Sequence, residues 1–478
     1  MASATTAPAK KPVLETRSID WIPLNERKGI VWHQAPFWFT GNFVLTTMLT
    51  GFTGPALGLS VGWSVVAAVL GACFGTLFMC FHANQGPTMG LPQMIQSRAQ
   101  FGSRGALLPF LAVVFVYIGF NVFNVILATN GLDEHHHVPK AIMYAGLIII
   151  SVVIAVVGFD LMMAVQRYLT YVLILVFGIL TIYALVHLHL GSQIDGGGTF
   201  TFTAFLVQFA AAAGYQISYA VYVSDYSRYL PEDTPGPKVI WWTYLGAAGS
   251  SVWLMSLGAV LSSAMPGDEV QVVRNLGDEL FSGFGTITVI ICAIGLVTIM
   301  SVNSYGAMLT SASAIDAFRK VTPTLRLRVA GISITSVIAF VVALAIPDSF
   351  QASFLNFVFL MLYFLVPWTA VNLVDFYWVR HGHYSIVDIF RPDGIYGRWG
   401  WRGLTAYVVG VLAMVPFMYL SFFKGPIAKA LNGADISFII GLAVSGALYF
   451  FLTRGLDLRA EEEAMKRSRA ELLAGAEG

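Results

Sequence analysis

Hydrophobic residues of this chain fall into long runs that short polar segments separate. A helix needs about 20 apolar residues to cross the hydrocarbon core of a membrane. Twelve runs are of about this length, so the pattern predicts an all-α polytopic membrane protein with twelve transmembrane helices. We expect these helices over residues 35–59, 62–84, 106–130, 140–159, 164–190, 203–224, 238–265, 283–312, 327–347, 350–377, 403–423 and 434–453.

Two of these runs contain residues that interrupt a helix at membrane depth. The first run holds Trp38-Phe-Thr-Gly-Asn-Phe43 and Gly51-Phe-Thr-Gly-Pro55, and the sixth holds Gly214-Tyr-Gln216. Backbone that breaks inside a bilayer must line a cavity or be covered by protein. Discontinuous helices of this kind mark binding sites in secondary transporters. For the sixth run alone, an unbroken membrane helix with a polar seam is the alternative.

The two interrupted helices lie five helices apart, so they cross the membrane in opposite directions. This arrangement predicts a five-plus-five inverted repeat with two further helices at the end. We expect four parts: an N-terminal tail (1–34), a transport core (35–377, with repeats at about 35–190 and 203–377), helices 11 and 12 (378–453) and a charged C-terminal tail with a short surface helix (454–478).

Composition agrees with a membrane protein and indicates its orientation. The chain is 57% hydrophobic and 11% charged, whereas soluble domains have about 25% charged residues. If the N-terminus is cytoplasmic, 23 of the 27 Lys and Arg residues lie in the N-terminal tail, the inside loops and the C-terminal tail. Because cytoplasmic loops carry an excess of Lys and Arg, we expect both termini inside, at the plasma (inner) membrane. The net charge of +1 gives no sign of nucleic-acid binding.

Polar residues inside four of the predicted spans indicate a binding cavity, because such residues usually face the protein interior. In the third helix, Tyr117, Asn121 and Asn124 share one face by their spacing. We expect them to wall a small cavity near the bilayer midplane with Thr40, Asn42, Tyr215, Gln216, Thr298, Ser301, Asn303 and Tyr305. For any one residue, packing or an interhelical hydrogen bond explains its presence about as well.

The chemistry of this predicted cavity indicates its ligand. It offers amides, hydroxyls and aromatic faces, and the middle of each predicted span lacks Lys, Arg, Asp and Glu. A small, neutral, flat heterocycle suits such a site, because it stacks on a ring and forms hydrogen bonds at its edge.

Charged pairs lie near the expected cytoplasmic ends of two helices: Asp225 with Arg228, and Asp375 with Arg380. Either they are salt bridges that close an inner gate, or they are anchors whose long side chains reach the interface.

Several of these stretches resemble the nucleobase–cation symporter-1 family, the bacterial purine, cytosine, uracil, thiamine and allantoin permeases. The matching segments are Trp38-Phe-Thr-Gly-Asn-Phe43, the segment from Gly90 to Gly102, the segment from Tyr215 to Pro231, Asn303-Ser-Tyr305 and the segment from Pro367 to Tyr377. The motif Asp225-Tyr-Ser-Arg-Tyr-Leu-Pro231 is similar to the cytosine/purine branch. The resemblance implies the LeuT-type inverted-repeat fold and alternating access.

The resemblance also implies roles for single residues. Tyr117 lies where the family has a ring that stacks on the substrate, often Trp, and Asn121 lies where a substrate-binding Gln can occur. Gln216 lies where related members have an aromatic residue, and whether Tyr215 or Gln216 faces the substrate is open. Asn42 and Asn303 are further substrate contacts.

Sodium-coupled members hold the ion between the first and eighth helices. By resemblance, its ligands here are backbone carbonyls near Thr40, Phe43 and Thr298 and two successive side chains, Ser301 and Val302. Because Val302 has no side-chain oxygen, one ligand is missing. We therefore expect no resident cofactor and either Na+ or H+ as the coupling ion, with proton coupling the natural substitute although no mid-span carboxylate is present to carry the proton.

The leading hypothesis is a secondary active transporter that imports a neutral nucleobase or related heterocycle of the cytosine, purine or uracil type. The alternative is a permease for allantoin, hydantoin or a vitamin such as thiamine or pyridoxine. A cationic ligand is disfavoured by the missing acidic residue, although cation–π contacts with Tyr117 or Tyr215 would favour it. We do not expect an enzyme, because the spans hold no catalytic constellation, nor a channel, because no charged ring or filter repeat is present.

Overall fold

The computed structural model describes residues 19–133, 137–157, 159–188, 199–321, 324–346 and 350–477. Their regular structure is helical, apart from two isolated β-bridges, Leu59 with Thr199 and Tyr419 with Lys424. Among the described residues, nine helices are long and apolar enough to cross a membrane, and a bent pair of helices is a tenth candidate. The prediction of an all-α polytopic membrane protein is therefore confirmed.

The long helices agree with the predicted spans to within a few residues. The first, eleventh and twelfth predicted spans correspond to broken or shorter helices, so the number twelve stays a prediction. The unbroken helices of the bundle are α4 (Val61–Ala83), α8 (Leu107–Leu132), α9 (Lys140–Val157), α10 (Phe159–His187), α14 (Gly236–Ala264), α16 (Phe284–Asp316), α17 (Leu325–Ala345), α18 (Phe350–Val374), α20 (Trp401–Met414) and α22 (Ser437–Thr453). Shorter helices in the connections are η1 (Leu24–Glu26), η2 (Val31–His33), α5 (Gln85–Met89), α6 (Gln93–Gln96), α7 (Arg98–Phe101), α15 (Glu269–Leu280), η4 (Asp375–Val379), α19 (Ile386–Ile389), η5 (Val415–Phe417) and α21 (Pro426–Ala430).

Both helices that the sequence predicts to be discontinuous are broken. The first consists of α1 (Gln34–Asn42), α2 (Leu45–Gly51) and α3 (Thr53–Ala56), and Val44 between α1 and α2 is extended. The sixth consists of α12 (Phe202–Ile217), η3 (Ser218–Val221) and α13 (Val223–Ser227). Gly214 lies within α12, so the sixth helix breaks one turn later than the glycine suggests.

Small residues let the broken sixth helix approach its neighbour closely. A Cβ atom on Gly71 of α4 would lie 2.2 Å from the carbonyl oxygen of Phe209, and one on Gly75 would lie 2.3 Å from that of Ala213. Membrane helices associate through such small-residue contacts, because apolar burial alone does not favour helix contact over lipid contact. The packing of α4 on α12 therefore fixes the position of the sixth helix, which the sequence analysis assigns to the binding site.

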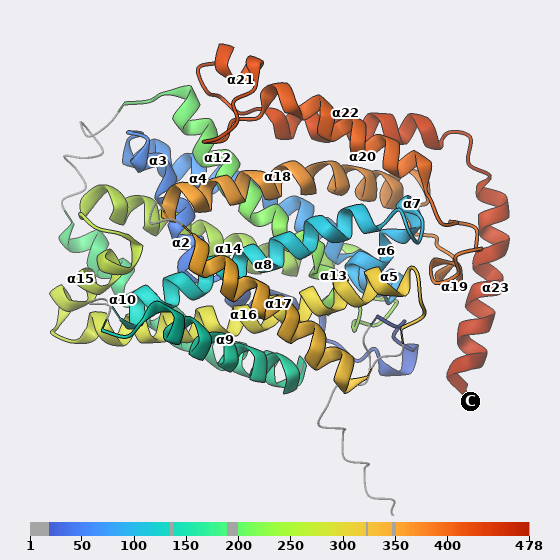
Figure 1. Cartoon of the computed structure of the whole chain (residues 1–478), viewed down its shortest axis with the longest axis horizontal. Helices are drawn as coiled ribbons and strands as arrows, with labels where there is room; N and C mark the ends of the chain where they lie inside the picture. The colour runs from blue at the N-terminus through green and yellow to red at the C-terminus, as the bar shows by residue number, and fades with distance from the viewer. Residues whose placement is uncertain are drawn as a thin grey trace, which may run out of the picture.

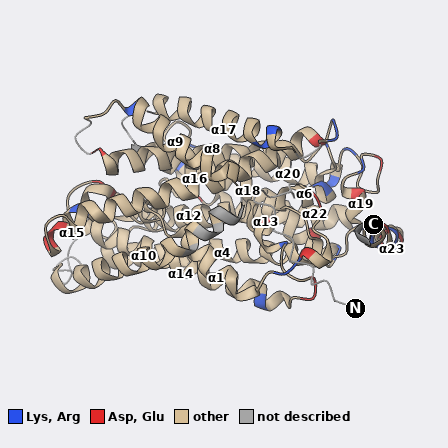
Figure 2. Cartoon of the chain, turned by 90° about the horizontal axis from the view of Figure 1, so that it is seen from below, with Lys and Arg blue, Asp and Glu red and all other residues tan. Residues whose placement is uncertain are grey.

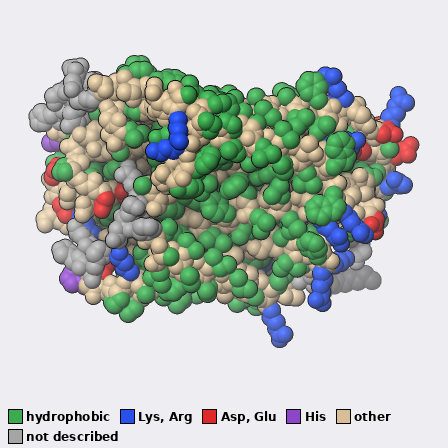
Figure 3. Space-filling view, turned by 45° about the horizontal axis from the view of Figure 1, so that its top comes forward, with side chains coloured by type: hydrophobic (Ala, Val, Ile, Leu, Met, Phe, Trp, Pro, Cys, Tyr) green, Lys and Arg blue, Asp and Glu red, His purple; other side chains and the backbone are tan. Residues whose placement is uncertain are grey.

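The bundle has two charged ends and an apolar middle. The long helices run side by side in Figure 1, and Lys, Arg, Asp and Glu gather at their ends in Figure 2. In the view of Figure 3, hydrophobic side chains cover the surface between these ends. We call one end the α15 end and the other the α23 end, after α23 (Leu458–Glu477), which confirms the helix expected in the C-terminal tail.

At the α15 end, the amphipathic helix α15 begins with a capping box on Asp268, whose carboxylate accepts bonds from the backbone N–H groups of Val270 and Gln271. The next side chain, Glu269, is 5% exposed. Burial raises the pKa of the Glu269 carboxyl to about 7, because a charged carboxylate is poorly solvated there.

We expect this carboxyl to make stability depend on pH. Since its pKa is higher in the folded than in the unfolded chain, folding binds a proton between about pH 4.5 and 7, and stability falls as pH rises through that window. Above pH 7 the loss of stability amounts to about 3 kcal/mol at most.

Thermal unfolding of the purified protein from pH 5 to 8.5 measures this loss of stability. The variant Glu269→Gln should lose this pH dependence, whereas the exposed control Glu279→Gln should keep it; equal profiles for Glu269→Gln and the native chain would contradict the assignment.

Candidate functional site

The backbone break of the first helix is closed by a side chain rather than left open. The hydroxyl of Thr47 donates to the carbonyl oxygen of Asn42 at 2.5 Å, and the N–H of Phe43 donates to the carbonyl oxygen of Thr40 at 3.0 Å. These bonds satisfy carbonyl groups that the helix end leaves without intrahelical partners. The break in the first helix is therefore stabilised by specific hydrogen bonds.

Tyr215 of α12 connects the two broken helices at this point. Its hydroxyl lies within hydrogen-bond distance of Thr47 Oγ1, at 2.9 Å, and donates to Thr46 Oγ1 at 3.2 Å. The sequence analysis did not assign Thr46 and Thr47 to the site. Two hydroxyl residues directly after a predicted helix break could have indicated them.

Buried rings surround this junction. We define the aromatic cluster as six residues, each less than 5% exposed. The ring of Tyr117 on α8 lies 5.5 Å from that of Tyr222 at an interplanar angle of 33°, and Phe120 meets Tyr215 edge-on at 5.4 Å. Tyr219 lies 5.8 Å from Tyr215 and 5.6 Å from Tyr222. The members of the aromatic cluster are Trp38, Tyr117, Phe120, Tyr215, Tyr219 and Tyr222.

The position of Tyr117 is set by a glycine on α16. A Cβ atom on Gly306 would lie 2.5 Å from Cζ and 2.6 Å from the hydroxyl oxygen of Tyr117, so only a residue without a side chain leaves room for the ring. Tyr117 thus lies between the backbone of α16 and Tyr222.

Asn121, one turn further along α8, carries an available acceptor. Its Nδ2 donates to Ser304 Oγ at 2.9 Å, which joins α8 to α16. Within the described part of the chain, its Oδ1 is buried and has no hydrogen-bond partner, and the same holds for Oδ1 of Asn124. Buried polar groups normally have partners, so an N–H group of a ligand is a natural partner for Asn121. Asn303 is 2% exposed on α16, next to Ser304.

Two of the predicted substrate-binding amides point toward α14 instead. Asn42 Nδ2 donates to the carbonyl oxygen of Ala247 at 2.9 Å, and Gln216 Nε2 donates to the same oxygen at 3.1 Å. Gln216 Nε2 also bonds to Thr76 Oγ1 on α4 and to Ser251 Oγ. Of the adjacent pair, Tyr215 contacts the aromatic cluster, and direct ligand contact by Asn42 or Gln216 stays a prediction.

The helices of the predicted cation site lie beside each other. A Cβ atom on Gly41 would lie 4.0 Å from Gln166 Oε1 on α10 and 4.0 Å from Ile299 Cδ1 on α16, so this end of α1 lies between those helices. Ser301 Oγ donates to the carbonyl oxygen of Thr298 at 2.6 Å. The hydroxyl of Thr40 contacts that of Thr170 on α10.

Two side chains decide what this site can offer a cation. Val302 is buried and supplies no oxygen, as the sequence indicates. Gln166 Oε1 is buried without a partner among the described residues and was not foreseen. The ring of Phe43 packs on Phe177 and Trp253, so only its backbone is available to an ion.

The predicted gating pair lies at the α23 end. Asp225 Oδ1 accepts a bond from the backbone N–H of Gln93 at 2.8 Å. Arg228 Nε donates to the carbonyl oxygen of Asp225 at 3.2 Å, and its NH1 group donates to that of Asp20 at 3.4 Å. Both side chains are less than 9% exposed, so they are interior contacts rather than interfacial anchors. Their role in gating stays a prediction.

Comparison with known proteins adds to this geometry. Residues 21–441 match the family described as permease for cytosine/purines, uracil, thiamine, allantoin. The chain is 40% identical over 445 residues to YxlA of Bacillus subtilis, which is named as a purine-cytosine permease; the match covers 92% of this chain and 96% of that protein. It is 24% identical to the purine-cytosine permease FCY2 of Saccharomyces cerevisiae, over 93% of this chain and 86% of that protein.

A solved structure is similar over almost the whole length. It is Mhp1, a nucleobase-cation-symport-1 family transporter in a closed conformation with bromovinylhydantoin bound, with a TM-score of 0.71 at 17% identity, over 96% of this chain and 99% of that one. At this identity the likeness concerns the fold alone. It confirms the expected inverted-repeat transporter fold with discontinuous first and sixth helices.

Proposed function

Because this chain belongs to the family of permeases for cytosine/purines, uracil, thiamine and allantoin, we propose that it imports a neutral nucleobase or a related small heterocycle by alternating access. It is a membrane transporter, not an enzyme. The observation that carries the proposal is the aromatic cluster at the junction of the two broken helices, with the free acceptor of Asn121 beside it. Secondary transporters of this fold bind substrates at such junctions.

The substrate contacts follow from this arrangement. A flat heterocycle stacks on Tyr117 and places an N–H group at Asn121 Oδ1, while Tyr215 and Asn303 border its other edges. Asn42 and Gln216 bond the broken helices to α14 and so support the site. Since these contact residues are all uncharged, the site favours a neutral ligand over an ionised one.

We further propose that the α23 end faces the cytoplasm, with both termini inside the plasma (inner) membrane. The excess of Lys and Arg in the tails and loops that lie at this end supports the orientation. Import then means that substrate enters from the α15 end and leaves toward α23.

Coupling to a cation is expected from the site between α1 and α16. Carbonyl oxygens at a helix break are the usual ligands in such transporters. Because Val302 removes one hydroxyl, we propose that protons rather than sodium drive uptake. The unpartnered Gln166 Oε1 is the oxygen that would replace the missing ligand if sodium binds after all.

Uptake of labelled compounds into proteoliposomes tests the function. The panel is cytosine, uracil, adenine, hypoxanthine, allantoin, thiamine and pyridoxine, each with a sodium gradient or a proton gradient imposed separately. We expect saturable uptake of a neutral nucleobase that a proton gradient drives and sodium does not change. Sodium-driven uptake would overturn the proton assignment alone, whereas no uptake of any compound under either gradient would overturn the substrate class.

A further inference from the structure

Helix α23 crosses the end of the bundle instead of leaving it. It departs from α22 at an angle of 90° and lies across the ends of the long helices in Figure 1. Along its length it bonds to the segment that follows η4: the hydroxyl of Ser385 donates to the carbonyl oxygen of Ala464 at 3.3 Å, and the N–H of Val387 donates to Ser468 Oγ at 2.9 Å. A C-terminal tail is thus held on the bundle by specific contacts.

The central contact between α23 and the bundle is a buried cluster of charges. Glu461 of α23 accepts two bonds from Arg380, at 2.7 and 2.9 Å, and Arg380 also bonds to Asp375 of η4. The side chains of Glu461, Arg380 and Asp375 are 16%, 5% and 0% exposed. Removing one partner of a buried ion pair leaves the other charge without compensation and is strongly unfavourable. This cluster therefore dominates the attachment of α23.

Two other ion pairs of α23 are much weaker by the same reasoning. Arg391 pairs with Glu471 at 2.8 Å while both side chains are more than half exposed, and Arg469 pairs with Glu232 at 2.9 Å with the arginine 61% exposed. Exposed pairs contribute little, because water and salt screen them.

From Asp375, a chain of buried side-chain hydrogen bonds leads to the broken sixth helix. Gln100 donates to Asp375 at 2.6 Å and accepts from Asn372 at 3.4 Å; Asn372 accepts from Gln85 at 2.6 Å. Gln85 accepts from Gln93 at 2.9 Å, and the backbone N–H of Gln93 donates to Asp225 of α13 at 2.8 Å. The attachment of α23 is therefore linked to the predicted gating residue through one continuous network.

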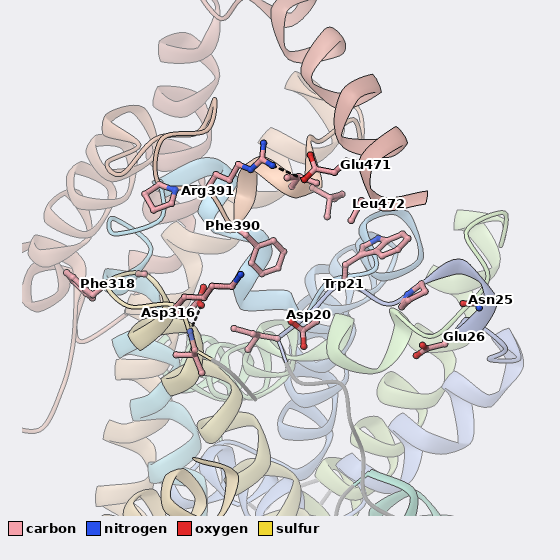
Figure 4. A pocket seen from close by; sticks show the side chains of 18 residues that line it. Asp20, Trp21, Asn25, Glu26, Asp316, Phe318, Phe390, Arg391, Glu471 and Leu472 are labelled. Carbon is pink, nitrogen blue, oxygen red and sulfur yellow. Dashed lines mark hydrogen bonds and ion pairs between the residues drawn. The ribbon is translucent and has the colours of Figure 1, made fainter. Parts of the chain in front are cut away.

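Two cavities lie between α23 and the helix ends. The larger, of about 870 Å³, extends from Asp316 at the end of α16 to Glu471 and Leu472 of α23, and Figure 4 shows its labelled walls with Arg391 bonded to Glu471. The second, of about 470 Å³, is lined by Trp21 and Tyr384 on one side and by Met465 and Lys466 of α23 on the other. In both cavities, α23 forms part of the wall.

We propose that α23 is a part of the inner gate, which Glu461 holds closed through Arg380 and Asp375. While α23 is bound, the hydrogen-bond chain keeps α13 and the α5–α7 segment against the end of α18. When the path from the aromatic cluster opens toward this end, the Glu461–Arg380 contact breaks and α23 moves away. The assignment rests on the proposed transport function.

Thiol labelling of the purified protein in nanodiscs, where both faces are accessible, tests this gate. The reporter is Met94→Cys, at a position that is 3% exposed. It lies on α6, a helix that contacts both α13 and α16. Cys73, Cys80 and Cys292 of this chain are replaced by Ala. In Glu461→Gln, a charged maleimide should modify this cysteine about fivefold faster or more, because a lost coupling contact shifts the closed–open equilibrium. The matched control Glu462→Gln, an exposed neighbour on the same helix, should change the rate less than about twofold.

A second variant covers the case in which Glu461→Gln does not fold. Ala464 is 2% exposed where α23 meets Ser385, so Ala464→Trp pushes α23 outward and leaves every charge in place. It should accelerate labelling as well. Unchanged labelling in a folded Glu461→Gln or Ala464→Trp protein would overturn the gate assignment, even if uptake of a nucleobase is normal. Faster labelling without uptake of any compound in the panel would support the gate assignment and overturn the proposed substrate class.

Discussion

Replacing Tyr117 by Ala is expected to weaken uptake by about 10- to 100-fold, mainly through a higher KM. Stacking of a base on an aromatic ring contributes about 1–3 kcal/mol, and Gly306 of α16 lies against the ring of Tyr117. Gly306 contacts the hydroxyl end of this ring, and Tyr222 packs beside it at 5.5 Å, so the position of the ring is fixed. Initial rates of uptake as a function of substrate concentration measure the effect.

Two further variants separate stacking from other effects. Tyr117→Phe keeps the ring and should retain uptake within about fivefold, because a net hydrogen bond contributes only about 1 kcal/mol or less. Gly306→Ala keeps Tyr117 itself but places a methyl group where its ring lies, so it should resemble Tyr117→Ala. Normal uptake in both Tyr117→Ala and Gly306→Ala would show that the substrate does not stack at this position.

Replacing Asp375 by Ala is expected to cost about 3–5 kcal/mol of stability, the largest loss for any single substitution that we consider. Its carboxylate accepts bonds from Gln100, Arg380, Tyr384 and Tyr449, and its side chain is fully buried. Without it, Glu461 is the carboxylate that remains paired with Arg380, and three neutral donors lose this acceptor. The fraction of monodisperse protein and its thermal unfolding temperature measure the loss.

A matched control shows whether burial causes this effect. Asp393 also pairs with an arginine, Arg398, at 3.1 Å, but the two side chains are 86% and 49% exposed. Asp393→Ala should therefore change stability by less than about 0.5 kcal/mol. Similar losses for Asp375→Ala and Asp393→Ala would contradict the view that the buried cluster holds this end of the bundle together.

Much of the architecture could be predicted because membrane spans and their interruptions are local features. Runs of apolar residues mark the long helices, and Gly41 and Gly214 lie close to the breaks even though the second break comes one turn later. The face shared by Tyr117 and Asn121 follows from helical spacing alone. Helical spacing also relates Tyr215, Tyr219 and Tyr222, so the sequence contains this signal. The sequence analysis assigned only Tyr215 to the site.

Contacts between distant segments could not be predicted. Asn42 and Gln216 both bond to Ala247, and nothing in their local sequence distinguishes an amide that faces a ligand from one that ties a helix to a neighbour. The chain from Asp225 to Asp375 joins residues that only the packing of several helices brings together. Gln166 was missed for the same reason, since its place beside Gly41 depends on how α10 crosses α1.

The central claim is that a neutral heterocycle binds at the aromatic cluster. Equilibrium binding of the labelled compound that the uptake panel identifies, to the purified native chain and to Tyr117→Ala, tests it without any gradient or gating step. We predict saturable binding to one site in the native chain and a dissociation constant about 10- to 100-fold higher in a folded Tyr117→Ala protein. Equal affinity in the two proteins would contradict the claim and place the substrate elsewhere in the bundle.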